Sequence, residues 1–111
     1  MANREIIRTD TVSVRIMELA GGAATEWHLH TEVTDFFVGL SGTVVVETRQ
    51  PETSVTLLPG ERTEVPVGRM HRVMNLTPGM AEYLLVQGVG HYDFRRVPDA
   101  GNDTETMKPE R

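Results

Sequence analysis

The sequence predicts an all-β fold, a sandwich or a barrel, and two observations lead to this prediction. Short runs alternate between apolar and polar residues and are rich in valine, threonine and aromatic side chains, which is typical of strands with one buried face. Glycine and proline pairs separate these runs at regular intervals, as turns do in an all-β domain. Helical periodicity is hard to find along the chain.

The expected strands follow one another in chain order, with a turn between neighbours. In the first, Val12, Val14 and Ile16 share one face by alternation, and Ser13 and Arg15 share the other. The further runs are 24–30, 36–40, 43–48, 54–58 and 82–87. The turns are expected at Gly21-Gly22, Ser41-Gly42, Pro59-Gly60, Pro66-Val67-Gly68 and Pro78-Gly79.

The chain of 111 residues is long enough for one hydrophobic core but not for two. We therefore expect a single domain over residues 1–97. Within it, residues 50–53 are expected to form the loop of a hairpin, because Pro51 cannot donate a hydrogen bond in the middle of a sheet. Residues 98–111 offer almost no apolar surface, so we expect a flexible polar tail there.

Composition excludes several classes of function. The net charge of −5 argues against nucleic-acid binding, which needs a basic surface. The chain has no cysteine, which excludes disulfides, thiolate metal sites and cysteine nucleophiles. Its one lysine, Lys108, lies in the expected tail, which excludes a catalytic Schiff-base lysine in the folded body. The N-terminus is too polar for a signal peptide, and no apolar run is long enough to span a membrane. We expect a cytoplasmic protein that binds neither nucleic acid nor membrane.

The stretch HLHTEVTD, residues 28–35, holds two of the four histidines of the chain and two carboxylates. On a strand, His28 and His30 project from the same side. Imidazole is a common ligand of divalent first-row metals, and a nearby carboxylate compensates their charge. Taken alone, the stretch is a weak signal, because two histidines at this spacing in a surface strand are more often solvated side chains than ligands.

A second stretch, residues 60–75, combines glycine and proline with a further histidine. Gly60, Pro66 and Gly68 require turns at defined places, and so determine where the next strand begins. On that strand His71 and Asn75 share one face. Without a metal, His71 would be a core histidine that is hydrogen-bonded to Asn75 or to a backbone carbonyl.

Taken together, the two stretches closely resemble the paired signature motifs of the cupin superfamily, and in particular its small single-domain members. The first block runs from Gly22 to Gly42 and the second from Gly60 to Asn75. The resemblance implies a double-stranded β-helix, a jelly-roll barrel whose wider mouth encloses a metal ion. The metal-ligand positions that it implies are His28, His30, Asp35 and His71.

The sequence departs from the family pattern at Asp35, where the family usually has glutamate. Aspartate is one methylene shorter and reaches about 1.5 Å less far. Asp35 therefore binds the metal after a small backbone shift, binds it through water, or leaves the ion to the three histidines. Glu32 in the connecting loop is a substitute that the motif spacing does not favour.

Two further groups are candidates for chemistry. Glu26 shares the expected face of the two histidines and is a candidate catalytic base or partner of a metal ligand, as Asp35 is a candidate base if it is not a ligand. A solvated or salt-bridged glutamate is the more common role for a residue such as Glu26. His91 fits neither motif, and we expect it to be structural or exposed at a strand end. The residues expected to line an apolar pocket or to fill the core are Phe37, Met70 and Met74.

The expected cofactor is a divalent transition metal, namely Fe, Mn, Ni, Co or Zn, because nitrogen and oxygen donors do not select among these ions. Three or four protein ligands leave coordination positions open, as in catalytic sites. The first hypothesis is a mononuclear metal-dependent dioxygenase or related oxygenase acting on a small organic molecule. The alternatives are an isomerase, epimerase or lyase acting on a sugar or hydroxy acid, and a binding module without turnover.

The resemblance also implies a homodimer, which is typical of small single-domain members of the superfamily. Apolar residues on the strand faces opposite the histidines are candidate contacts with the second subunit. The residues are Trp27, Phe36, Val38 and Leu40. The N-terminal strand, from Ile6 to Ile16, is the candidate element for exchange between subunits.

Overall fold

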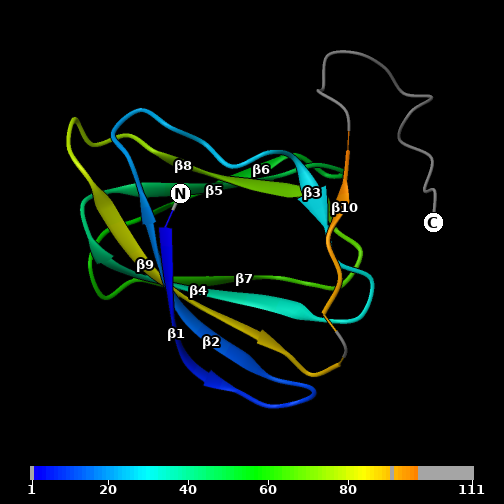
Figure 1. Ribbon diagram of the computed structural model, residues 1–111. Helices are drawn as coiled ribbons and strands as arrows, with labels where there is room; N and C mark the ends of the chain where they lie inside the picture. Colours follow the sequence, from blue (N-terminus) through cyan, green and yellow to red (C-terminus); the bar gives the residue numbers. More distant parts are fainter. Residues whose placement is uncertain (1, 91, 98–111) are drawn as a thin grey trace.

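In the computed structural model, which describes residues 2–90 and 92–97, the regular elements are all β-strands. They form two five-stranded antiparallel sheets that face each other (Figure 1). The first sheet has the order β1 (Ala2–Arg8), β2 (Ser13–Leu19), β9 (Ala81–Gly88), β4 (Thr34–Ser41) and β7 (Arg62–Val65). The second has the order β10 (Arg95–Arg96), β3 (His28–Leu29), β8 (His71–Asn75), β5 (Val44–Thr48) and β6 (Thr53–Leu57). The predicted all-β jelly-roll architecture, a double-stranded β-helix, is confirmed.

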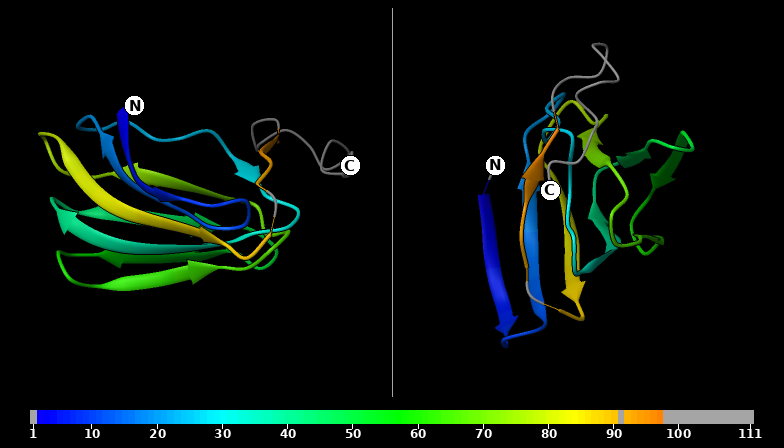
Figure 2. Two further views of the ribbon diagram at one scale, coloured as in Figure 1. Left: turned by 60° about the horizontal axis from the view of Figure 1, so that its bottom comes forward. Right: turned by 90° about the vertical axis from the view of Figure 1, so that its right-hand side faces the viewer.

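Neighbours in each sheet are mostly far apart in the sequence. β9 lies between β2 and β4, and β8 lies between β3 and β5, so the centre of each sheet consists of strands that are distant in the sequence (Figure 2). The expected hairpin joins β5 to β6, with Thr48 opposite Thr53. Among the described residues no helix is long and apolar enough to cross a membrane. The expected tail, 98–111, and the candidate His91 lie outside the described residues.

The run 24–30, expected as one strand, is regular only at His28–Leu29. Ala24 forms an isolated bridge to Met74. The hydroxyl of Thr25 accepts a hydrogen bond from the Val73 backbone N–H at 2.9 Å, a place that a backbone carbonyl takes in a regular ladder. This local substitution explains why alternation in the sequence does not produce a continuous strand here.

The apolar core lies between the sheets and reaches the histidines, because the Phe37 ring lies 6.1 Å from the His71 ring. Tyr83 and Phe37 are its largest fully buried side chains, and their rings pack 5.8 Å apart. The other buried members are Met17, Leu19, Val44, Val46, Leu57, Val65, Val73, Ala81 and Leu85. The turn between β4 and β5 depends on Gly42, which has a φ of 74° and lies so close to Ala81 that a Cβ atom would be 2.8 Å from the Ala81 Cβ.

On β2, alternation places Ser13, Arg15, Met17 and Leu19 on the inner face of the sheet. Val14 and Ile16 therefore face outward, whereas Val12 precedes the strand. Arg15 therefore points into the barrel, although the sequence pattern did not identify it as a candidate.

Candidate metal centre

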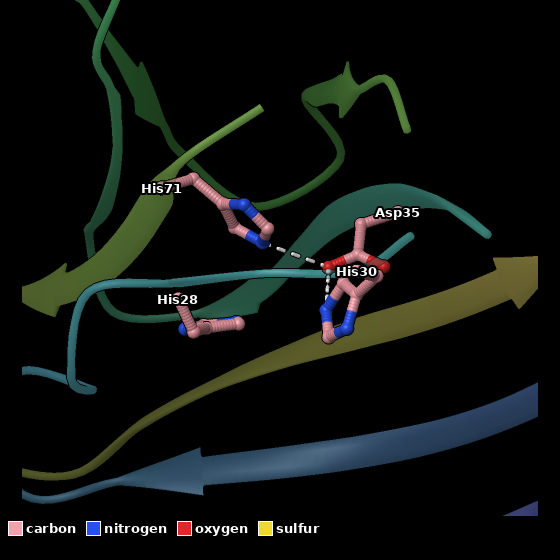
Figure 3. Close-up of side chains that lie close together, drawn as sticks. All are labelled: His28, His30, Asp35 and His71. Carbon is pink, nitrogen blue, oxygen red and sulfur yellow. Dashed lines mark hydrogen bonds and ion pairs between the residues drawn. The ribbon is translucent and has the colours of Figure 1, made fainter. Parts of the chain in front are cut away.

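Four side chains from both sheets converge at one end of the barrel (Figure 3). His28 on β3 and His71 on β8 are cross-strand partners, His30 follows β3, and Asp35 lies on β4 of the opposite sheet. All are buried, and their donor atoms lie within 4.8 Å of one another. Every residue of the predicted ligand set is thus brought into a single group.

The carboxylate of Asp35 lies between two of the imidazoles. Its Oδ2 is 3.0 Å from His30 Nε2 and 2.9 Å from His71 Nε2. About 3 Å is also the separation of adjacent ligand atoms around an octahedral ion with bonds of about 2.1 Å. The spacing of these donors therefore fits a single transition-metal ion.

The outer nitrogen of each imidazole is held by a backbone carbonyl. His28 Nδ1 lies 2.7 Å from Glu26 O, His30 Nδ1 lies 2.5 Å from Asp93 O, and His71 Nδ1 lies 2.8 Å from Arg69 O. A carbonyl oxygen only accepts, so each Nδ1 must carry a proton and donate it. In the neutral ring, Nε2 then carries a lone pair that faces inward, and this is the tautomer that binds a metal through Nε2.

Lone pairs that face a carboxylate oxygen at hydrogen-bond distance repel it unless a positive charge lies between them. Either a proton or a metal ion can supply that charge. The donor set of three imidazoles and one carboxylate suits a divalent transition metal. The group therefore has both the geometry and the chemistry to bind one.

The ionisation of these residues follows from burial and mutual contact. Burial, together with the adjacent His71, lowers the pKa of His28 to about 3, so this ring is neutral at physiological pH. Burial also disfavours charge on His30 and Asp35. The hydrogen bond and charge of Asp35 nevertheless raise the pKa of His30 above 6.5, and the hydrogen bonds from His30 and His71 hold the pKa of Asp35 well below its usual range.

The model of the cupin domain family matches residues 15–87, more than half of the chain. This protein belongs to the cupin family. No curated protein matches the sequence.

Solved structures with the same fold include several cupins of low sequence identity. An uncharacterized conserved protein with a double-stranded β-helix domain from Klebsiella pneumoniae is 19% identical, with a TM-score of 0.74 over 86% of this chain and 82% of that one. TT1209 from Thermus thermophilus is 27% identical, with a TM-score of 0.72 over 80% and 83%. An oxalate oxidase in complex with the substrate analogue glycolate is 21% identical, with a TM-score of 0.76 over 87% of this chain and 55% of that one. This cupin thus spans about half the length of the oxalate oxidase.

A cavity of about 440 Å³ opens beside the metal-binding group of this cupin. This is within the usual range for small-molecule sites. Its walls include His28, His30 and Asp35, and the core residues Phe37, Tyr83 and Leu85. Phe37, expected either to line a pocket or to fill the core, does both. Met70 instead packs with Trp27 and Val97, and Met74 is not among the residues that line the cavity.

Glu26, the candidate base, lies at the edge of this cavity and points partly into solvent. Its side chain is 57% exposed, and its Oε1 is 2.9 Å from Arg96 Nε. The salt-bridged form of this residue is therefore present, and its catalytic role stays a prediction. Glu32 is exposed and is not part of the metal-binding group.

Several residues at the site carry no motif signal and were missed. Gln87 is buried on β9 and its Nε2 donates to Asp35 Oδ1 at 3.1 Å. Phe94 stacks on His28 at 4.4 Å, and Tyr92 lies 5.2 Å from the His30 ring. Arg15 and Tyr92 both line the cavity. Alternation on β2 and β9 could have grouped Arg15 and Gln87 by face, but only the pairing of these strands reveals which face is inside.

Proposed function

We propose that this cupin is a mononuclear metal-dependent enzyme of the oxygenase type that acts on a small organic molecule. The observation that supports it best is the convergence of three inward-facing Nε2 lone pairs and one carboxylate beside a cavity of about 440 Å³. Four protein donors leave coordination positions for a substrate on an octahedral ion. The oxalate oxidases among the structural neighbours lend support to an oxidative reaction.

His28, His30, Asp35 and His71 would hold the ion. A bound Fe, Mn, Ni, Co or Zn ion supplies Lewis-acid or redox chemistry, and these donors do not select among the metals. The carboxylate of Asp35 offsets part of the positive charge. The apolar wall formed by Phe37, Leu85 and Phe94 excludes water from the reacting group.

A second candidate function rests on Glu26. This carboxylate lines the cavity near its edge and could exchange a proton with a bound hydroxy acid or sugar. The protein would then be an isomerase, epimerase or lyase that turns over without oxygen. A binding module without turnover is the third candidate.

The test of the metal site is elemental analysis of protein purified without chelator, beside a His28→Ala/His71→Ala variant. We expect about one metal ion per chain in the wild type and far less than one in the variant, because two of the imidazole ligands are lost. Circular dichroism should show the same all-β fold in both proteins. Equal metal content in the two proteins would disprove the site.

The test of the reaction is loading with Fe(II) under anaerobic conditions, followed by oxygen exposure with candidate diketones and phenolics. Oxygen uptake that depends on the ion and on His28 and His71 supports the oxygenase. Turnover of a hydroxy acid without oxygen, lost in Glu26→Gln, would support the second candidate instead. Ligand-induced thermal shifts without any product would favour the binding module.

A further inference from the structure

Arg15 is the one arginine or lysine among the described residues that line the cavity. It extends from the inner face of β2, next to Met17 and Leu19. The rest of the wall is mostly apolar, apart from the metal-binding group, Gln87 and residues at the edge. A charged side chain directed into such a cavity is costly unless it is paired and hydrogen-bonded, and charged groups kept in clefts often belong to functional sites.

Among the described residues, Arg15 has no acidic side chain as a counterion. Its Nη2 donates to Gln87 Oε1, and its guanidinium lies 5.7 Å from the centre of the Tyr92 ring. None of the ion pairs found among the described residues includes it. Its Nε is buried and has no hydrogen-bond partner within the described part of the chain. A donor of this kind is normally satisfied by an acceptor.

Gln87 links Arg15 to the metal-binding group. The amide accepts from Arg15 through Oε1 and donates to Asp35 Oδ1 at 3.1 Å through Nε2. The guanidinium thus lies one side chain away from a predicted metal ligand, within reach of a small molecule that also contacts the ion. With a divalent ion bound, the positive charge of the ion and of Arg15 exceeds the negative charge of Asp35. The cavity then favours an anion.

We propose that Arg15 is the specificity-determining residue of the site, and that it binds a carboxylate of a small organic acid whose second oxygen donor group reaches the metal. The planar guanidinium matches a carboxylate in two parallel hydrogen bonds, which fits this residue better than a lysine would. Gln87 orients the guanidinium. The proposal rests on the proposed function for the presence of the ion, and it adds the class of substrate.

The test compares lactate with lactamide, which has the same shape, keeps the hydroxyl that can reach the metal, and carries a neutral amide in place of the only carboxylate. Binding of each to zinc-loaded protein is measured by titration calorimetry, and metal content is determined before and after. We expect the wild type to bind lactate about 10- to 100-fold more tightly than lactamide, the range for a hydrogen-bonded charge. Arg15→Gln should abolish this preference and retain the zinc.

Two further variants complete the design. Arg15→Lys keeps the charge without the planar fork and should retain part of the preference. Arg62→Gln, which removes an exposed arginine on β7, should behave as the wild type.

Each outcome bears on a different claim. Failure of the wild type to bind zinc would overturn the proposed function and this inference with it. Zinc binding with equal affinity for the two probes in the wild type, or with an unchanged preference in Arg15→Gln, would overturn the role of Arg15 alone. The comparison of probes in the wild type needs no variant, so it stands even if Arg15→Gln does not fold.

Discussion

Backbone carbonyls determine what the imidazoles of this site can bind. The carbonyls of Glu26, Asp93 and Arg69 each take the Nδ1 proton of one histidine. In the neutral rings the inner nitrogens therefore carry the lone pairs, and Asp35 brings a negative charge within 3.0 Å of two of them. Such fixed outer contacts commonly matter for affinity almost as much as the ligands themselves.

At the same scale, Asp35→Asn tests whether the aspartate acts as a ligand despite its shorter side chain. The variant keeps the shape and removes the negative charge. We expect metal affinity to fall at least about tenfold, because even contacts outside the ligand set are worth about 10- to 100-fold. The measurement is competition with a chelating dye, with Glu64→Gln on β7 as a matched control. An unchanged dissociation constant would mean that the histidines suffice.

Asn75, the last residue of the second motif, has a structural role. Its Nδ2 donates to the carbonyls of Leu19 and Gly79, each at 2.8 Å, and its Oδ1 accepts from the Thr77 N–H at 2.7 Å. We expect Asn75→Ala to lower the free energy of unfolding by about 3 kcal/mol, at about 1 kcal/mol for each lost bond. Urea denaturation measures the change. Metal stoichiometry of the folded variant should match the wild type, and a loss of metal with full stability would contradict this role.

At the scale of elements, residues 92–97 form a mouth segment that includes β10, which pairs with β3 (Figure 1). Its Phe94 and Tyr92 rings contact His28 and His30 of the metal-binding group. The Asp93 carboxylate accepts from the Thr31 N–H at 2.8 Å and from its hydroxyl at 2.7 Å, and Asp93 O holds His30. The Val97 N–H donates to Trp27 O at 3.0 Å. The mouth segment lies outside both motifs but orients one of the predicted ligands.

Thr31→Val tests this role of the mouth segment. The substitution removes the hydroxyl bond to Asp93 and conserves the side-chain volume. We expect metal to be lost to excess chelator roughly 3- to 10-fold faster, which corresponds to about 1 kcal/mol for a hydrogen bond. Stopped-flow mixing measures the rate. Thr56→Val, on exposed β6, is the control, and equal rates in the two variants would show that the mouth segment does not retain the ion.

At the scale of the whole molecule, the outer face of the first sheet is unusually apolar. One cross-strand row consists of Ile7, Val14, Val86 and Phe36, and the next contains Ile16, Leu84 and Val38 between Arg4 and Arg62. In Figure 2, no other strand of the described residues covers this face. A contiguous apolar face of this kind is typical of an interface between subunits. Trp27, another expected contact, lies elsewhere and is covered by Arg49 and Arg72 at 3.8 and 4.9 Å from its ring.

The homodimer therefore stays a prediction, and this face is where we expect it. Light scattering should give about twice the 12.4 kDa of the chain for the wild type. Phe36→Lys should give a monomer, because it places a charge on a side chain that is 40% exposed in the isolated chain. Leu58→Lys, which alters an exposed residue outside these rows, should remain dimeric. A wild-type mass near 12.4 kDa would refute the dimer.

Much of the fold and the ligand set could be predicted, because both depend on local patterns. Alternation and turn residues indicated β2, β4, β5, β6 and β9. The two motifs carried the resemblance to the cupin superfamily, and that resemblance implied His28, His30, Asp35 and His71 as ligands. These signals depend on residues that are close together in the chain, so they can be recognised without the structure. The irregular backbone before His28 was not predicted, because it depends on a hydrogen bond between Thr25 and Val73, far away in the chain.

The sequence by itself determined the class of fold and the residue types that could bind a metal, since strand periodicity and turn chemistry are properties of neighbouring residues. Only the tertiary structure decided which face of β2 points inward, and hence that Arg15 lines the cavity beside Gln87. It also decided that the mouth segment holds His30. These contacts join strands that are distant in the chain, and their register is set by the packing of the two sheets rather than by any local pattern.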